Sequence, residues 1–332
     1  MGHPDGPDLS VVVPVRDVEA YVGTMLESLC RNVAVAAAGG VRVEVVFVDD
    51  GSVDGTGQRV ADALPRLPGA VVLRNEVARG LAAARNQGTA VAGGRWLAYL
   101  DGDDWLAPGH LLDLARAMGA LQVDFLRVDH VRVQGRARSV RRAPEGRRGV
   151  ALDPRSAILP EWAETMVDYP NAWAGAYDLR LRDEGLLHFP EHLLTAEDRA
   201  MIWPLHLRAR SFAVVSAPGV FYRRGVPGSL TQIGDERQLH FLDASDVVVR
   251  EVCADRDAER LLPKAVRQLI GLVLHHLQHE DRLTAELRDL QRRRCLERFT
   301  SLPDGVLAWT LRGLQPSRAA ALAVLWPGRV AA

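Results

Sequence analysis

The sequence predicts an α/β protein in which a mostly parallel sheet is flanked by helices and followed by an all-helical C-terminal domain. Over the first 135 residues, short runs of β-branched and other apolar residues alternate with segments of helical apolar spacing. The apolar runs are continuous rather than alternating, which is typical of strands buried on both faces. Beyond residue 235, apolar residues recur at helical spacing almost to the end of the chain.

The elements of the first part can be assigned in order. Strands are expected at 9–15, 43–48, 71–73, 96–100 and 123–133. Helices are expected between them at 18–30, 55–67 and 81–92, and another begins near Pro108, a residue suited to the first turn of a helix. This alternation of strands and helices predicts parallel strands joined by helical crossovers.

The rest of the chain divides into three stretches. Residues 135–149 hold six arginines among small and polar residues without a period, which favours an exposed loop, although a segment that grips an anionic acceptor stays an alternative. Residues 150–232 mix short helices and strands. Helical spacing recurs at 239–252, 261–277, 283–299 and 319–326. We therefore expect two domains, 1–232 and 233–332.

Composition excludes several classes of protein. The 332 residues are 48% hydrophobic and 25% charged, as in ordinary globular domains. Forty-one basic and 42 acidic residues leave a net charge of −1, which disfavours a nucleic-acid partner. Lys264 is the only lysine; the arginine excess suits carboxylate and phosphate binding, but a GC-rich genome explains it more simply.

Cysteine content and the absence of long apolar runs indicate a cytoplasmic protein. Cys30, Cys253 and Cys295 lie far apart and form no zinc or disulfide pattern. The N-terminus lacks the basic and apolar regions of a signal peptide, and no run reaches the roughly 18 apolar residues of a membrane span. Contact with the inner face of the membrane stays open, through Arg292–Arg294 and the tryptophans that follow, as does a homo-oligomer formed through the C-terminal helices.

Three acidic clusters follow predicted strands. Asp17 follows the first strand, Asp49–Ser52 the second and Asp101–Asp104 the fourth. In an open α/β sheet, ligands bind beyond the carboxyl ends of the strands. Carboxylates gathered there suit Mg²⁺ or Mn²⁺, which also bridge phosphate oxygens. One such cluster would be explained by the preference of aspartate for turns, whereas three at one edge favour a site for a nucleotide diphosphate with a metal.

Four motifs in order resemble those of a known family. They are Ser10–Pro14 (SVVVP), Val48–Thr56 (VDDGSVDGT), Gly80–Gly88 (GLAAARNQG) and Trp96–Trp105 (WLAYLDGDDW). Over about residues 8–230 the chain resembles an inverting family-2 glycosyltransferase with the GT-A fold, which is a Rossmann-like sheet flanked by helices. The resemblance implies transfer of a sugar from a nucleotide diphosphate donor, most commonly UDP-linked.

The resemblance also assigns donor-binding residues. Asp50, with Asp49 beside it, matches the aspartate that binds the uracil edge, and Asp101-Gly102-Asp103 matches the DxD motif. In that motif Asp103 binds the divalent cation, and Asp101 holds the ribose or a metal-bound water. The remaining donor contacts implied are Pro14, Val15, Asp17, Arg79, Arg85, Asn86, Arg223 and Arg224. Arg16-Asp17 and Ala78 depart from the family's pattern, which leaves the identity of the base less secure than the fold.

The catalytic residues are expected in Thr195–Met201. Inversion requires a general base that deprotonates the acceptor hydroxyl, and Asp198 matches the family's base while Glu197 orients the acceptor. The local alternative is that Glu and Asp merely favour a helix N-terminus. Trp162, Trp173 and Tyr177 form either a sugar-stacking wall or part of the core, and core filling is favoured. His275, His276 and His279 are either metal ligands or a solvated or interfacial cluster, and the cluster is favoured.

The sequence thus predicts a metal-dependent glycosyltransferase that uses Mn²⁺ or Mg²⁺. It would move a sugar from a UDP-sugar to a hydroxyl of a glycan, a lipid-linked intermediate or a small molecule, in cell-surface or wall-polymer synthesis. Two alternatives stay open. A nucleotidyltransferase would need a glycine-rich, lysine-bearing N-terminal loop, which Val11–Asp17 is not. A non-catalytic sugar-nucleotide-binding protein should have lost the DxD motif or the base.

Overall fold

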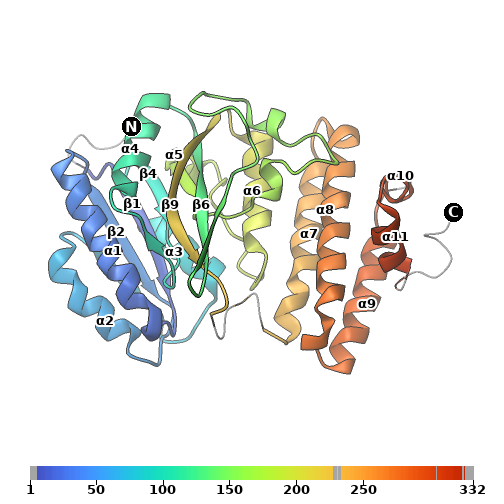
Figure 1. The fold of residues 1–332 in the computed structure, drawn as a ribbon, viewed down its shortest axis with the longest axis horizontal. Coiled ribbons are helices and arrows are strands. Elements are labelled where there is room, and N and C mark those ends of the chain that lie inside the picture. Colours follow the sequence, from blue (N-terminus) through green and yellow to red (C-terminus); the bar gives the residue numbers. More distant parts are fainter. Residues whose placement is uncertain (1–5, 227–229, 231–232, 304, 324, 326–332) are drawn as a thin grey trace.

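A computed structural model describes residues 6–226, 230, 233–303, 305–323 and 325. A sheet with helices packed against it forms one half of the molecule, and a group of helices forms the other (Figure 1). The expected domain boundary at residue 232 falls outside the described residues and stays a prediction.

The first half of the sheet is parallel, as the apolar runs predicted. β1 (Leu9–Val15) lies between β2 (Val43–Asp49) and β4 (Trp96–Tyr99), and β3 (Val71–Arg74) pairs with the far side of β2. All these pairings are parallel. Every residue of β1 is buried, which explains why its sequence shows no polar alternation.

The second half of the sheet is mixed. β8 (Gly175–Asp178) runs antiparallel between β4 and β6 (Phe125–Gln134), and β9 (Phe212–Arg223) runs parallel to β6. β5 (Trp105–Leu106) pairs with the end of β9. The strand order is therefore β3-β2-β1-β4-β8-β6-β9-β5.

The segment expected to be a loop is partly a strand. Within residues 135–149, β7 (Ala137–Arg141) pairs antiparallel with β6 beside the main order. The ladder with β6 satisfies its backbone, while most of its side chains are exposed. A strand with so little burial has no reason to carry apolar residues at a period of two, so the sequence pattern could not reveal it.

Helices cover the sheet. α1 (Glu19–Ala38) buries one stripe of apolar residues that includes Val22, Met25 and Leu29, at helical spacing. The other helices of this half are α2 (Thr56–Ala63), α3 (Leu81–Val91), α4 (His110–Leu121), α5 (Arg180–Asp183) and α6 (Glu197–Arg208).

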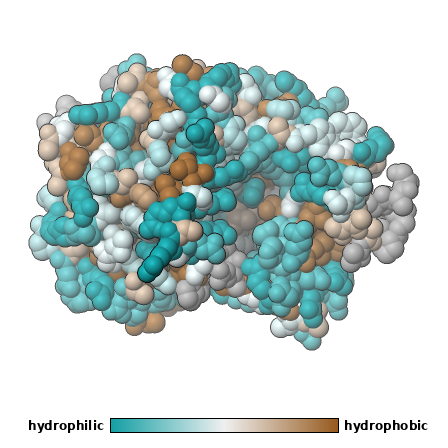
Figure 2. Space-filling model, in the orientation of Figure 1, coloured by the Kyte–Doolittle hydropathy of each residue, from teal (hydrophilic) through white to brown (hydrophobic). Residues whose placement is uncertain are grey.

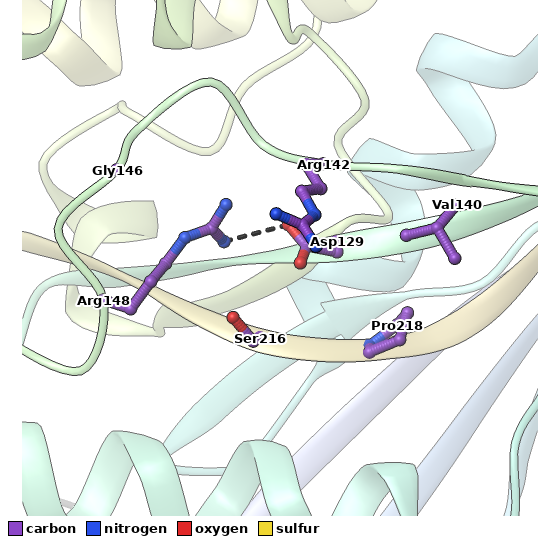
Figure 3. A pocket seen from close by; sticks show the side chains of 7 residues that line it. All are labelled: Asp129, Val140, Arg142, Gly146, Arg148, Ser216 and Pro218. Carbon is purple, nitrogen blue, oxygen red and sulfur yellow. Dashed lines mark hydrogen bonds and ion pairs between the residues drawn. The ribbon is translucent and has the colours of Figure 1, made fainter.

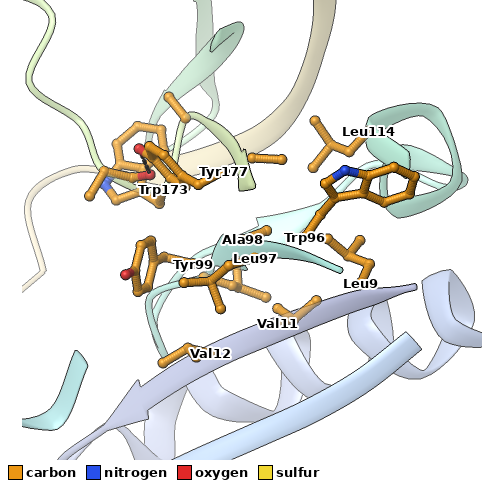
Figure 4. Packing of buried hydrophobic residues seen from close by; sticks show 14 of the residues in the cluster. Leu9, Val11, Val12, Trp96, Leu97, Ala98, Tyr99, Leu114, Trp173 and Tyr177 are labelled. Carbon is orange, nitrogen blue, oxygen red and sulfur yellow. Dashed lines mark hydrogen bonds between the residues drawn. The ribbon is translucent and has the colours of Figure 1, made fainter. Parts of the chain in front are cut away.

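The main core lies between the sheet and these helices. Side chains from β1 and β4 pack there with Trp173 and Tyr177 (Figure 4). Both of these aromatic side chains are buried, which supports their interpretation as core residues rather than a sugar-stacking wall. Trp162 is 41% exposed and packs against Trp309 of the helical half, with ring centroids 5.9 Å apart.

The helical half shares a second core with α6. The helices of this half are α7 (His240–Cys253), α8 (Ala258–Gln278), α9 (Ala285–Thr300), α10 (Val306–Arg312) and α11 (Pro316–Ala323). Trp203 and Leu207 of α6 belong to the same apolar cluster as the buried residues of α7 and α8. Of the expected helix 319–326, Trp326 lies outside the described residues.

Polar side chains on α9 and α8 have structural partners. Arg294 pairs with Asp243 of α7, which favours helix packing over a membrane-surface role for this arginine. His276 stacks on Phe241 with ring centroids 3.9 Å apart. Among the described residues no cluster of three His, Cys, Asp or Glu side chains could hold a metal, and no helix is long and apolar enough to cross a membrane.

A buried ion pair fastens α8 to the sheet half. Lys264, which has no exposed surface, pairs with Asp168 and donates to the carbonyl of Ala163 at 2.8 Å. Arg267 and Gln268 of α8 also donate to Asp168. Burial lowers the pKa of Lys264 to about 8. Burial alone would raise the pKa of Asp168, but Lys264, Arg267 and Gln268 together outweigh it and hold this pKa below its usual value.

We expect Asp168→Ala to lower the free energy of unfolding by about 3 kcal/mol, because it leaves a buried ammonium without a carboxylate. Urea denaturation measures the change. Asp183→Ala is the control, since the Asp183 side chain is 72% exposed in its pair with Arg182 and its loss should cost less than about 0.5 kcal/mol. Equal stabilities of the two variants would contradict the structural role of Asp168.

Candidate active site

Asp50 shapes the loop that precedes α3. Its Oδ1 accepts hydrogen bonds from the side chain of Asn75 and the backbone N–H of Arg79, each at 2.8 Å, and its Oδ2 accepts one from the N–H of Gly80 at 2.8 Å. Because Oδ2 accepts only one bond, it keeps capacity for a further donor, such as the edge of a nucleobase.

Asp49 and Asp17 hold the neighbouring turns. Asp49 is buried and accepts from the N–H of Ser52 and from Arg74, both at 2.9 Å. Asp17, at a φ of +48°, accepts from the N–H of Val53 at 2.9 Å, and its own N–H donates to Ser52 Oγ. Asp17 therefore fastens the loop after β1 to the loop after β2, and Asp49 fastens that second loop to Arg74 of β3.

The DxD segment rests on the end of β1. A Cβ on Gly102 would lie 3.0 Å from Val15 Cγ1 and 3.2 Å from the carbonyl oxygen of Pro14, so only glycine fits without displacing a neighbour. Pro14 and Val15 are buried. The structure thus places these two residues beneath the DxD backbone as its support.

Asp103 and Asp104 of this segment form no ion pair among the described residues. Asp104 is buried, its Oδ1 accepts from the N–H of Arg223 at 2.7 Å, and its Oδ2 has no partner among the described residues. Burial and the charge of Asp101 raise the pKa of Asp103 to about 6. Burial and the charges of Asp103 and Asp101 raise the pKa of Asp104 well above its usual value.

Arg85 joins the DxD segment to the start of α6. Its side chain is 1% exposed, its Nη2 donates to Asp101 at 2.8 Å, and its Nη1 donates to Glu197 at 2.9 Å and to Asp198 at 2.6 Å. Burial alone would lower the pKa of Arg85, but the three carboxylates outweigh it and raise this pKa. Arg85, which the resemblance assigns to donor binding, is thus a buried side chain that holds three other predicted site residues together.

Asp198 is fixed at both carboxylate oxygens. Oδ1 meets Arg85, and Oδ2 accepts from the N–H of Ala172 at 3.0 Å. Burial raises the pKa of Asp198 while Arg85 opposes the shift. Burial and the charge of Asp198 raise the pKa of Glu197 to about 7.

Two of the predicted donor contacts, Asn86 and Arg79, have partners within the protein. Asn86 exchanges hydrogen bonds with the backbone of Phe189, at 2.8 and 2.9 Å, and so fastens the loop before α6. The guanidinium of Arg79 pairs with Glu191 at 3.1 Å.

Arg223 and Arg224 have different partners. Arg223 donates from Nε to the carbonyl of Asp103 at 2.9 Å, whereas Arg224 donates to the Tyr222 hydroxyl at 3.3 Å. Successive residues of a strand face opposite sides of a sheet, so only the first of these arginines lies against the DxD segment.

Two residues with a place in the site were not assigned from the sequence. Asn75 bridges Asp50 and Gln87, and Arg199 directly follows Asp198 in the first turn of α6. Nothing in the local sequence pattern marks Asn75. The adjacency of Arg199 to the predicted base was the only available signal.

The residues present fit a divalent cation shared with a substrate. Asp103 offers a carboxylate without a side-chain partner among the described residues, and Asp101 keeps one oxygen free of Arg85. Mg²⁺ is usually bound by one or two carboxylates together with substrate phosphates. The raised pKa values of Asp103 and Asp104 indicate that a positive charge here would stabilise the ionised carboxylates.

A separate cavity of about 440 Å³ lies between β6, β9 and the segment after β7 (Figure 3). Arg148 is turned toward Asp129 and pairs with it at 2.9 Å. The lining residues are Asp129, Val140, Arg142, Gly146, Arg148, Ser216 and Pro218. None of them is among the predicted site residues.

Comparison with known sequences decides the family. A sequence model described as glycosyl transferase family 2 matches residues 10–175, half of the chain. The protein belongs to glycosyltransferase family 2. The match contains β1, β2, β4 and the DxD segment, and it ends before Asp198.

Bacterial relatives of this family-2 glycosyltransferase match different lengths of it. The succinoglycan biosynthesis protein ExoO of Rhizobium meliloti is 29% identical over 79% of this chain and 73% of its own. The uncharacterized glycosyltransferase EpsJ of Bacillus subtilis is 24% identical over 68% of this chain. The matched segments span 31% and 64% of the lengths of the B. subtilis proteins EpsH and EpsJ.

Solved structures share the fold. S. aureus TarS residues 1–349 in complex with UDP-GlcNAc superposes with a TM-score of 0.76 at 21% identity, covering 95% of this family-2 chain and 87% of the TarS chain. A mannosyltransferase from Pyrobaculum calidifontis in complex with GDP-Man and Mn²⁺ gives a TM-score of 0.54 at 18% identity, covering 96% and 79%.

We expect Arg85→Met to lower the free energy of unfolding by at least about 3 kcal/mol at pH 8, because three carboxylates lose their buried counter-charge. The loss should shrink toward pH 5. Carboxyl groups whose pKa is higher in the folded than in the unfolded protein bind protons preferentially when folded, so a fall in pH favours folding. Urea denaturation at both pH values measures the difference.

Arg116→Met is the control for this variant, since Arg116 is exposed on α4. It should leave stability within about 0.5 kcal/mol of the wild type. A loss of stability in Arg85→Met that is the same at pH 5 and pH 8 would contradict the proposed electrostatic role.

Proposed function

We propose that the protein transfers one sugar from a nucleotide diphosphate sugar, a UDP-sugar, to a hydroxyl acceptor with inversion, in the synthesis of a cell-surface or wall polymer. The observation that carries this proposal is the placement of Arg85 between Asp101 and Asp198. It sets the donor-binding segment and the predicted base beside one another. The names of the relatives ExoO and TarS support the polymer context and the UDP-linked donor.

The donor would lie beyond the ends of β1, β2 and β4. Asp50 Oδ2 accepts from the nucleobase, and Arg223, which is held against the DxD segment, faces the diphosphate. Mn²⁺ or Mg²⁺, bound by Asp103 and by Asp101 through its free oxygen, would stabilise the charge that develops on the leaving diphosphate.

Asp198 acts as the general base. One of the Asp198 carboxylate oxygens takes the proton of the acceptor hydroxyl. The acceptor oxygen bonds to the anomeric carbon on the side opposite the diphosphate, which leaves with the bonding electrons. Arg85 and the N–H of Ala172 hold the carboxylate in place throughout. Glu197, with a pKa near 7, orients the acceptor or the base from the neighbouring position.

The alternative of a nucleotidyltransferase finds little support. That activity would call for a lysine at the phosphates, and the only lysine of the chain is buried in its pair with Asp168.

We expect Asp198→Asn to lower kcat for UDP release about a thousandfold, because the amide cannot accept the hydroxyl proton. A coupled assay of UDP release over a panel of UDP-sugars measures the rate, and calorimetry should show UDP affinity changed by no more than about threefold. Asp183→Asn is the matched control and should keep wild-type turnover. Unchanged turnover in Asp198→Asn, with the fold intact, would exclude Asp198 as the base.

We expect Asp103→Ala to abolish the stimulation of UDP release by Mn²⁺ and to lower the rate at saturating metal at least about a hundredfold. The same variant should bind UDP with an affinity that no longer depends on Mn²⁺. If the variant keeps full metal-stimulated activity, the assignment of Asp103 to the cation is wrong.

A further inference from the structure

Three arginines close to the predicted base lack an ion-pair partner among the described residues. Arg132 lies on β6, Arg199 on α6 and Arg224 just beyond β9. Neither Arg132 nor Arg199 makes a side-chain hydrogen bond within the described ranges, and Arg224 has only the Tyr222 hydroxyl. We call these three residues the arginine belt.

The sheet register brings two members of the belt together. Arg132 is paired with Tyr222, and the N–H of Arg224 donates to the carbonyl of Val133 at 2.8 Å, which continues the ladder. Arg132 and Arg224 therefore lie on the same face of the sheet. Partial burial lowers the pKa of Arg132, and the charges of Arg141 and Arg224 lower it further. Arg141 is excluded from the belt because it pairs with Glu164.

Arg199 approaches the same space from the helical side. His275 of α8 has a pKa that is lowered by burial and by surrounding positive charges, of which Arg224 and Arg199 are two. Burial also lowers the pKa of Arg199 itself, while the charges of Asp168 and Asp198 oppose the shift. Figure 2 shows many hydrophilic side chains on the surface where the sheet half meets the helical half.

The belt adjoins the reacting centre on the side of the base. Arg199 follows Asp198 directly in α6. Tyr222, the partner of Arg224, packs against Trp173 with ring centroids 5.0 Å apart, and Trp173 adjoins Ala172, whose N–H binds Asp198. Arg223 lies against the DxD segment on the opposite face of β9. The belt therefore lies beside the base and not on the face that carries the DxD contacts.

We propose that the acceptor is an anion, and that the arginine belt binds an acidic group, a phosphate or a carboxylate, carried near the hydroxyl that receives the sugar. Arg132 and Arg224 repel one another because no described carboxylate pairs with either of them, and each guanidinium group offers a fork of donors that matches either acid. An acidic group between Arg132, Arg199 and Arg224 would remove the repulsion and aim the neighbouring hydroxyl at Asp198. This inference rests on the proposed function, because it concerns the acceptor of that reaction.

The test measures binding to the full chain saturated with UDP and Mn²⁺. Calorimetry compares three probes of matched length: a glycerol phosphate oligomer, a galacturonate oligomer and a neutral cello-oligosaccharide. We expect one acidic probe to bind at least about tenfold more tightly than the neutral one, with an affinity that falls as salt is raised. The tighter of the two acidic probes shows whether the acidic group of the acceptor is a phosphate or a carboxylate.

Variants then assign the effect to the belt. Arg132→Gln and Arg199→Gln should each weaken the preferred acidic probe about tenfold and leave UDP affinity unchanged, while Arg116→Gln, on exposed α4, should change neither. Equal affinity for all three probes would overturn the inference. So would a loss of UDP affinity in the belt variants, because the belt would then serve the donor. A wild-type chain that binds no UDP would instead contradict the proposed function itself.

Discussion

The site depends on one buried guanidinium. Arg85 reaches from α3 to carboxylates at the end of β4 and at the start of α6, and a charge buried to this extent is tolerated only with such partners. The ion pairs set the separation between the DxD segment and Asp198, two parts of the chain almost 100 residues apart in sequence. The DxD segment and the predicted base are thus linked through a residue that is closed to solvent.

The helical half contributes to the same constraint. Trp203 of α6 donates to Gln268 of α8 at 2.8 Å, and Gln268 also binds Asp168. The helix that begins at Glu197 is therefore held on one side by Arg85 and on the other by α8. Because α6 packs into the core of the helical half, that half supports the helix that carries the predicted base.

The sequence predicted the parts of the fold whose burial is uniform. β1, β2 and β4 are largely buried and consist of continuous apolar runs, and the motifs after β2 and β4 locate Asp50 and Asp101. It failed where tertiary contacts decide. β7 exists because β6 offers a free edge, and Arg85 points to carboxylates rather than to open solvent because α6 lies across the site. Neither fact is a property of the local sequence.

The single lysine has a practical consequence. Because the Lys264 side chain has no exposed surface, reagents and enzymes that acylate lysine find no side-chain amine on the described folded structure. Amine-directed immobilisation or dye coupling through a lysine would thus require α8 to separate from Asp168. Labelling of Lys264 becomes a sensitive reporter of that opening, with almost no background from other side chains.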